Sequence, residues 1–543
     1  MEPATDPIEA LRACLGSANV AADAATRAQY ESATFQTEQR VSAVVYPDST
    51  AEVQAVVALA RRFGLALYPI SRGRNWGLGS RVPTRDESVV VDLRRMNRIV
   101  DFDEQLSCVT VEPGVTFQQL ADFLESKGSG LYLSVIGGPP DASVLGNTLE
   151  RGDGLGPLGD RCESSCALEA VLGTGECVRT GMGMFGPGPM SGLMATGLGP
   201  EISGLLFQSN FAIVTRLTLW LARIPEEFQG VAFAIKDPAA LAPAVAALRE
   251  LQQRGVLKAN SFALWNPQKF LASIMQYPFA ADGRALASPE QLLSHLPPAL
   301  RGAHWIGMAA LYSASKLHAR ADRRLLRQLL GPHVARLAIL GRSTASWLRF
   351  TRPFAAKVLG MDPDQMLRLL YSESPFLGHP TKFSSQSVYW RKRGPKAPEL
   401  DPDRDRCGLH WVCTAIPFEH AHLAKHAAIV ERVALGHELE PNLSYLNLSE
   451  RCLKSFAVIA FDRDADDEES RARRCHDQML RELSDAGYPP VRLGIQSMDK
   501  VTPADTTHIE LVRRLKRLFD PLDVIASGHY DFRHAWMVSD GDT

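Results

Sequence analysis

The sequence lacks most features that would place it in a specialised class of protein. Nine cysteines in 543 residues are too few for a disulfide scaffold, and no apolar run approaches the roughly 18 residues that a membrane span needs. The net charge of −2 provides no bulk field for nucleic acid or an anionic membrane. The first residues have neither the basic nor the apolar segment of a secretory signal, so we expect a cytoplasmic protein.

The sequence also offers little that would hold a metal. Cys162 and Cys166 have a CxxxC spacing, but no second Cys/His pair lies at zinc-finger distance. His422 and His426 are four residues apart in a probable helix, a spacing that could bind a metal. A solvated helix face explains that pair more simply, and we expect no metal site.

What is present is the composition of an ordinary globular protein, with 45% hydrophobic and 22% charged residues. Between residues 41 and 135, strands and helices alternate. Capping pairs predict helices that begin after Ser49 and Thr116 and end at Gly64 and Gly128. Apolar runs predict strands at 65–70, 88–93 and 108–111. This pattern predicts an α+β fold with short βα units.

The rest of the chain changes character twice. Glycine is dense between residues 137 and 215, which allows the backbone to approach a ligand closely. After about residue 225 the pattern suggests a second domain. Its expected helices are 238–256, 286–331 and 417–436, its expected strand is 453–461, and a last helix is expected at 507–519.

Three motifs carry the candidate chemistry. Residues 69–79 (PISRGRNWGLG) follow a predicted strand, and successive N–H groups in such a glycine-rich turn can hold a pyrophosphate. A plain surface turn is the alternative. Residues 146–160 and 204–215 are the second and third motifs, and each alone could be an ordinary polar loop.

Two matches to GxGxxG, at 154–159 and 181–186, are not dinucleotide fingerprints. Neither opens a helix after a strand, which that fingerprint requires. Pro157 lies inside the first match, and Pro187 and Pro189 follow the second.

The three motifs, in this order and spacing, resemble the FAD-binding domain, of the PCMH type, in the vanillyl alcohol oxidase / 4-cresol methylhydroxylase family of FAD-linked oxidoreductases. The resemblance extends over most of the chain, through residues 111–116, 408–411, 491–499 and 520–528. It implies an α+β protein with a two-part FAD-binding domain at 1–226 and 487–543. A substrate-binding α+β cap domain at 227–486 would be inserted between the two parts.

The resemblance also implies roles for single residues. His410 would bond the flavin covalently, Asp160 would lie near flavin N5, Arg492 would bind an anionic oxygen and His529 would lie near flavin N1. His410, Asp160 and Arg492 are the expected catalytic residues. The expected FAD-binding residues are Pro69, Ile70, Ser71, Arg72, Gly73, Arg74, Asn75, Leu78, Gly146, Asn147, Arg151, Gly159, Asp160, Ile213, His410, Arg492 and His529.

The chain departs from the family pattern in two places. Vanillyl alcohol oxidase activates its flavin-bonding histidine with a histidine of the N-terminal domain, but this chain has none before His295, so non-covalent FAD is the alternative. Leu78 and Val491 stand where relatives that oxidise 4-alkylphenols have two tyrosines. Without those hydroxyls a phenolate loses stabilising donors, so we expect a more apolar substrate, or one ionised elsewhere.

The function expected from the sequence is FAD-dependent removal of hydride from an alcohol, a benzylic or allylic C–H, or an amine carbon. Oxygen would reoxidise the flavin, and the role would be tailoring of a secondary metabolite. The alternatives are a dehydrogenase coupled to a cytochrome or quinone, and a redox-neutral cyclase or isomerase. We expect a small-molecule substrate and a homodimer.

Overall fold

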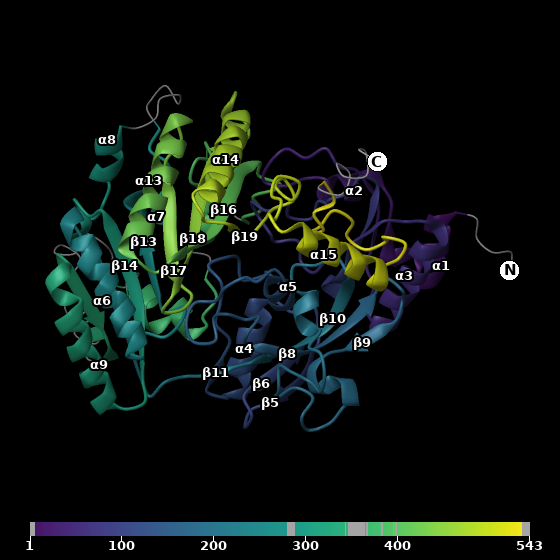
Figure 1. Cartoon of the computed structure of the whole chain (residues 1–543), viewed down its shortest axis with the longest axis horizontal. Helices are drawn as coiled ribbons and strands as arrows, with labels where there is room; N and C mark the ends of the chain where they lie inside the picture. The colour runs from purple at the N-terminus through teal and green to yellow at the C-terminus, as the bar shows by residue number, and fades with distance from the viewer. Residues whose placement is uncertain are drawn as a thin grey trace.

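The computed structural model describes residues 6–279, 288–342, 344–345, 364, 367–381, 384–394, 396 and 399–534. Figure 1 shows two lobes side by side. One combines the N-terminal part of the chain with the C-terminal segment, and the other surrounds a large sheet from the middle of the chain. Within the described ranges, no helix is both long and apolar enough to cross a membrane.

The first sheet of the N-terminal lobe has the strand order β1-β2-β4-β3. Its strands are β1 (Val20–Ala21), β2 (Val41–Val45), β3 (Leu67–Ile70) and β4 (Ser88–Asp92). β2, β3 and β4 are parallel, and α3 (Thr50–Phe63) connects β2 to β3. Ser49 caps α3 by accepting from the amide of Glu52, and Gly64 ends it at φ 67°. α1 (Pro7–Leu15) packs against α3, and α2 (Ala24–Tyr30) packs against β2.

The second sheet is antiparallel, with the order β5-β6-β10-β8-β9. Its strands are β5 (Ile99–Asp103), β6 (Cys108–Val111), β8 (Ser165–Leu172), β9 (Cys177–Arg179) and β10 (Ala212–Trp220). The core on this sheet includes α4 (Phe117–Lys127) and α5 (Val144–Leu149). β7 (Leu131–Tyr132) and β11 (Ala222–Arg223) form a separate pair.

The large sheet of the other lobe is antiparallel, with the order β15-β12-β14-β13-β17-β18-β16-β19. Its strands are β12 (Glu227–Ile235), β13 (Phe262–Trp265), β14 (Trp305–Ser313), β15 (Arg336–Leu340), β16 (Cys407–Pro417), β17 (Asn442–Asn447), β18 (Cys452–Asp462) and β19 (Pro490–Arg492). One apolar core joins this sheet to α6 (Leu241–Gln253), α9 (Lys316–Leu329), α13 (His420–Gly436) and α14 (Glu468–Asp485). Another core includes α7 (Pro267–Ile274) and α8 (Pro289–Ser294).

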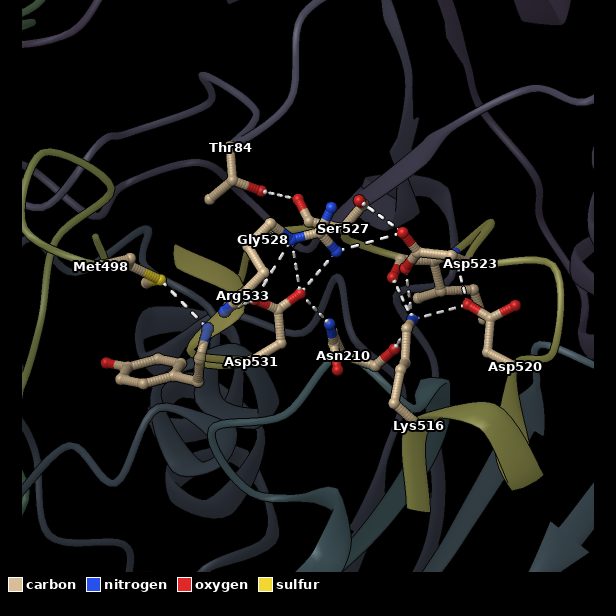
Figure 2. Close-up of polar contacts among 12 residues, drawn as sticks. Thr84, Asn210, Met498, Lys516, Asp520, Asp523, Ser527, Gly528, Asp531 and Arg533 are labelled. Atoms are coloured by element: carbon tan, nitrogen blue, oxygen red, sulfur yellow. Dashed lines mark hydrogen bonds and ion pairs between the residues drawn. The ribbon is translucent and has the colours of Figure 1, made fainter. Parts of the chain in front are cut away.

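The C-terminal segment returns from the large sheet to the N-terminal lobe. It contains α15 (Thr506–Phe519), and it pairs with β3 at Leu67. The amide of Ala526 donates to the Leu67 oxygen and the amide of Leu67 donates to the Val524 oxygen, both at 2.7 Å. Figure 2 shows the buried Lys516 at this junction. Its Nζ donates to the backbone oxygens of Asn210 and Ile525, both at 2.8 Å, and to Asp520 Oδ2 at 2.6 Å. Lys516 therefore ties the returning segment to the lobe where the chain began.

Most helices and strands predicted from the sequence are confirmed, but the helical pattern expected across 286–331 is wrong at its centre. The described part of that range contains α8, β14 and α9. β14 is a central strand. Six of its nine residues are apolar or glycine and buried, and they lie on both faces of the sheet. Such a strand has no alternation of apolar and polar residues, so its sequence cannot be distinguished from a buried helix.

The histidines of α13 also differ from expectation, because His426 faces the core and not solvent. Its Nδ1 lies 2.9 Å from the Tyr445 hydroxyl, and its Nε2 lies 2.9 Å from the Thr414 hydroxyl. Burial lowers the pKa of His426 to about 3, so the ring is neutral. Within the described residues, no group of three or more His, Cys, Asp or Glu side chains could hold a metal ion.

Candidate functional site

A cavity of about 450 Å³ lies between the two lobes. Its first wall consists of the loop that follows β3 and of α5 with the residues on either side of it. Its opposite wall consists of strands β13, β16, β17 and β18 together with α7. The cavity therefore places the expected cofactor loops directly opposite the large sheet.

The loop at 69–78, here called the nest loop, lines the first wall. Gly73 has φ 63°, which favours glycine. Within the residues that the structure describes, the amides of residues 72–75 donate no hydrogen bond to other protein groups. Successive free N–H groups around a left-handed residue form an anion-binding concavity. The nest loop therefore fits the pyrophosphate expected from the sequence.

The start of α5 completes this cradle. Ser143 caps the helix by accepting from the amide of Gly146 at 2.8 Å. A Cβ on Gly146 would lie 2.9 Å from Ser71 Oγ, so only glycine lets α5 approach the nest loop this closely. Of the residues expected to bind FAD, the cavity wall includes Pro69, Ile70, Ser71, Arg72, Gly73, Arg74, Asn75, Leu78, Gly146, Asn147, Arg151, Ile213, Arg492 and His529.

Arg492 and His529 both meet Glu150, which the sequence analysis did not select. Glu150 lies 3.3 Å from His529 Nε2 and 3.8 Å from Arg492 Nε, and Arg492 also donates to Asn75 Oδ1 at 2.9 Å. Burial opposes ionisation of Glu150, but His529 and Arg492 outweigh it and lower the pKa of the carboxyl. The nest loop, the end of α5 and the C-terminal segment thus share one network of hydrogen bonds and charges.

Of the two aspartates of this loop, Asp153, and not the expected Asp160, lines the cavity. Lys454 Nζ contacts its two oxygens at 2.7 and 2.9 Å. Burial raises the pKa of Asp153 even though Lys454 opposes the shift. The side chains of both residues are almost fully buried, which makes this an ion pair built into the wall.

Asp160 and Gly159 lie behind that wall. The chain turns back after Asp153, and the amide of Gly154 donates to the Gly159 oxygen at 2.8 Å. A Cβ on Gly159 would meet Asn260, and the Asp160 carboxylate accepts from the amide of Glu163 at 3.4 Å. These two residues shape the loop, and the sequence alone does not show which of the two aspartates faces the cavity.

His410 is the third expected residue outside the cavity wall. Side chains alternate along a strand, and the neighbours of His410 on β16, Leu409 and Trp411, line the cavity. The His410 ring stacks between Phe35 at 4.9 Å and Phe461 at 5.4 Å, on the α14 side of the sheet. Burial holds the pKa of His410 well below its usual value, and the nearby His476 adds to that effect.

The cavity wall on the large-sheet side is mainly apolar. Val491, at one of the tyrosine positions, lines it, and so do Trp265, Met308, Trp411 and Phe456, while Leu78, at the other position, lines the cavity from the nest loop. The Trp411 ring lies over Gly77, where a Cβ would come within 2.2 Å of it, and the indole N–H donates to the Trp76 oxygen at 3.1 Å. Trp411 therefore joins the nest loop to the large sheet.

Lys269 is the unexpected feature of this wall. It lies in the first turn of α7, lines the cavity, and is only 6% exposed. Its Nζ is 5.5 Å from the centre of the Trp411 ring. Burial lowers the pKa of Lys269 to about 8. No motif marks Lys269 in the sequence, because only the fold brings α7 to the cavity.

Comparison with known proteins matches residues 41–181 to the FAD binding domain family model. The 1'-carboxy-chondrochloren decarboxylase of Chondromyces crocatus is 40% identical over 540 residues, covering 99% of each chain. The flavoprotein subunit of 4-cresol dehydrogenase (hydroxylating) from Pseudomonas putida is 26% identical, covering 96% of this chain and 94% of that protein.

Two solved structures share the fold over nearly the whole chain. p-Cresol methylhydroxylase with substrate bound has a TM-score of 0.83 at 24% identity, with 97% of this chain and 96% of that chain covered. 4-Ethylphenol oxidase from Gulosibacter chungangensis, in an isoeugenol complex, has a TM-score of 0.83 at 23% identity, with the same coverage.

Proposed function

The chain belongs to the p-cresol methylhydroxylase family of FAD-dependent oxidoreductases, and on that basis we propose that it oxidatively decarboxylates a small carboxylic acid. The family, the fold class, the FAD cofactor and the enzyme class expected from the sequence are confirmed. The substrate class, the residue roles and the electron acceptor belong to the proposal.

One observation supports the choice of reaction: Leu78 and Val491, which the sequence predicts at the positions of the phenolate-binding tyrosines, both line the cavity with apolar side chains. A hydride leaves carbon readily only when another electron pair moves toward the site it vacates. Without hydroxyl donors, a phenolate in this position would lose its stabilisation. A carboxylate that departs as CO₂ can supply the electrons, and a full-length relative is a decarboxylase.

The proposed reaction balances without a further reactant. FAD, when bound, supplies a two-electron acceptor for hydride. The substrate has a carboxylate on one carbon, Cα, and a benzylic or allylic hydrogen on the next, Cβ. The Cβ–H electron pair leaves as hydride, the pair between Cα and the carboxyl carbon becomes the Cα=Cβ bond, and CO₂ departs. The product is an alkene.

The residues of the wall would perform three tasks. The nest loop would hold the pyrophosphate through its free amides. Arg492 and His529 would place positive charge near the flavin, balanced by Glu150. Asp153, oriented by Lys454, would stabilise positive charge that develops on Cβ as hydride leaves, the role the sequence assigned to Asp160.

Matched acids and amides test the proposal. The FAD-loaded protein would be mixed anaerobically with N-acylated β-aryl amino acids and, separately, with their carboxamides, which cannot release CO₂. We expect the acids to bleach the flavin absorbance and the amides to leave it unchanged. Equal bleaching by both would show dehydrogenation without decarboxylation and would overturn the proposal.

Oxygen is the proposed acceptor for the reduced flavin, and a cytochrome or quinone is the alternative. Stopped-flow mixing of the reduced protein with oxygen separates the two. Reoxidation well above the rate of free reduced flavin supports an oxidase, and a rate at or below that of free flavin contradicts it.

A further inference from the structure

Lys269 is a buried cation that has no task in the reaction proposed above. Its side chain lies on the cavity wall and is 6% exposed. Among the described residues, no oxygen accepts a hydrogen bond from its Nζ and no carboxylate pairs with it. Moving an ammonium group out of water is unfavourable unless the charge finds a partner. The protein thus carries an uncompensated charge that points to a partner from outside the chain.

The other cations on this side of the cavity are already matched. Lys454 is paired with Asp153 through two contacts of 2.7 and 2.9 Å, and Arg492 contacts Asn75 and Glu150. A substrate anion that approached either residue would compete with a carboxylate of the protein. Lys269 has no such competitor, so it offers the stronger attraction to an anion entering the cavity.

Buried lysines that serve the fold look different in this molecule. Lys516, also buried, donates to three oxygens of the protein, as Figure 2 shows. Lys269 has only the face of Trp411 near its Nζ, at 5.5 Å. A cation over an aromatic ring gains some attraction, but the donors of the ammonium group stay available for hydrogen bonds.

The position of Lys269 suits recognition of a substrate. Trp411, which lies beneath the ammonium group, also packs over Gly77 at the nest loop. Trp265, at the end of strand β13 and just before α7, also lines the cavity. An acid with an apolar or aromatic body could lie along these rings with its carboxylate at Lys269, close to the lobe that carries the cofactor.

We propose that Lys269 is the carboxylate-binding residue of the substrate cavity, and that it selects organic acids over neutral molecules of the same shape. The lowered pKa of about 8 leaves the group mostly charged at neutral pH. The proposal rests on the proposed function for the idea that the cavity holds the substrate. It adds that the substrate must carry a carboxylate and that Lys269 binds this group.

The test uses phenylacetate and phenylacetamide, which differ only in the charge of one group. Both are unreactive in the proposed reaction, because the ring carbon next to Cα carries no hydrogen that could leave as hydride. Titration of the FAD-loaded protein, followed by flavin difference absorbance and calorimetry, gives both dissociation constants. We expect the wild type to prefer the acid by roughly tenfold to hundredfold, the range of a hydrogen bond to a charged group. Equal affinity, or binding of neither probe, would overturn the proposal.

Variants locate that preference. Lys269→Met should abolish the preference and leave the affinity for the amide within about threefold, whereas Lys269→Arg should retain part of it. Lys258→Met, the same change at an exposed position, should behave as wild type. Flavin content serves as the check on folding for each variant. A Lys269→Met protein that still prefers the acid would assign recognition elsewhere.

Failure of this inference and failure of the proposed function give different results. Neither probe turns over, so the acid preference at Lys269 can be found even if no acid is decarboxylated. Conversely, the wild type could release CO₂ while Lys269→Met still prefers the acid to the amide. That result would support the proposed reaction and show that Lys269 does not bind the substrate carboxylate.

Discussion

Two buried lysines, one in each lobe, show how the same side chain serves opposite purposes. Lys516 is enclosed by oxygens of Asn210, Asp520 and Ile525, which hold the C-terminal segment on the first lobe. Lys269 is about as deeply buried, yet among the described residues it has no oxygen partner. Where the fold supplies the partners, a buried charge fixes structure. Where it does not, the charge is free to bind a ligand, and the fold bears the cost of desolvation.

The largest expected effect is that of Lys516→Met. The change leaves the carboxylate of Asp520, which is 1% exposed, without its cation. Removing one partner of a buried ion pair costs about 3–5 kcal/mol, so we expect the free energy of unfolding to fall by that amount. Urea denaturation followed by circular dichroism measures it. A stability equal to wild type would show that the junction does not depend on Lys516.

Lys269→Met is expected to change stability in the opposite direction and to raise the free energy of unfolding at pH 7. The pKa of Lys269 is lowered from 10.5 to about 8, so the folded state disfavours the charged form. Wild type therefore bears a penalty of up to about 3 kcal/mol below pH 8, which fades as pH rises from about 8 to about 10.5. The variant should be more stable at pH 7 and nearly equal near pH 10. Denaturation at both pH values, with Lys258→Met as control, checks this, and a less stable variant at pH 7 contradicts it.

The two aspartates provide the next comparison. Asp153 lines the cavity, whereas Asp160 caps the amide of Glu163. Asp153→Asn should slow flavin reduction by about 10²-fold, the scale of one lost electrostatic contact in a transition state, and Asp160→Asn should change it by less than about threefold. Anaerobic stopped-flow absorbance measures both rates. A slower flavin reduction in Asp160→Asn than in Asp153→Asn would contradict the assignment of Asp153 to the reaction.

The smallest expected effect is that of His410→Ala on the attachment of the flavin. Because its ring lies on the α14 side of β16, between Phe35 and Phe461, we expect the FAD to be held without a bond to it. Acid precipitation should release the flavin from wild type and from His410→Ala alike. Flavin retained by wild type and released by the variant would contradict this arrangement of β16 and support the covalent bond expected from the sequence.

Local patterns made much of the cofactor side predictable. The nest loop follows a strand, and its glycines and polar residues all lie within one short stretch of the sequence. The caps at Ser49 and Thr116 and the left-handed glycines that end both helices are equally local signals. Each depends on hydrogen bonds between residues only a few positions apart.

The substrate side depends on contacts that no local pattern contains. His410 and Trp411 are adjacent in sequence, and only the strand's orientation decides which of them faces the cavity. The choice between Asp153 and Asp160 depends on how one loop turns back, and Lys269 reaches the cavity through the packing of α7. The domain boundaries at 226 and 486, the cytoplasmic location and the homodimer stay predictions.

The central claim is that loss of CO₂ and reduction of FAD are one event. The most direct test is an anaerobic single turnover of the FAD-loaded protein with an N-acylated β-aryl amino acid labelled with ¹³C at the carboxyl carbon, with flavin bleaching and labelled CO₂ measured in the same vessel. The account predicts one CO₂ for each FAD reduced. Flavin reduction without labelled CO₂, or labelled CO₂ with the flavin still oxidised, would contradict it.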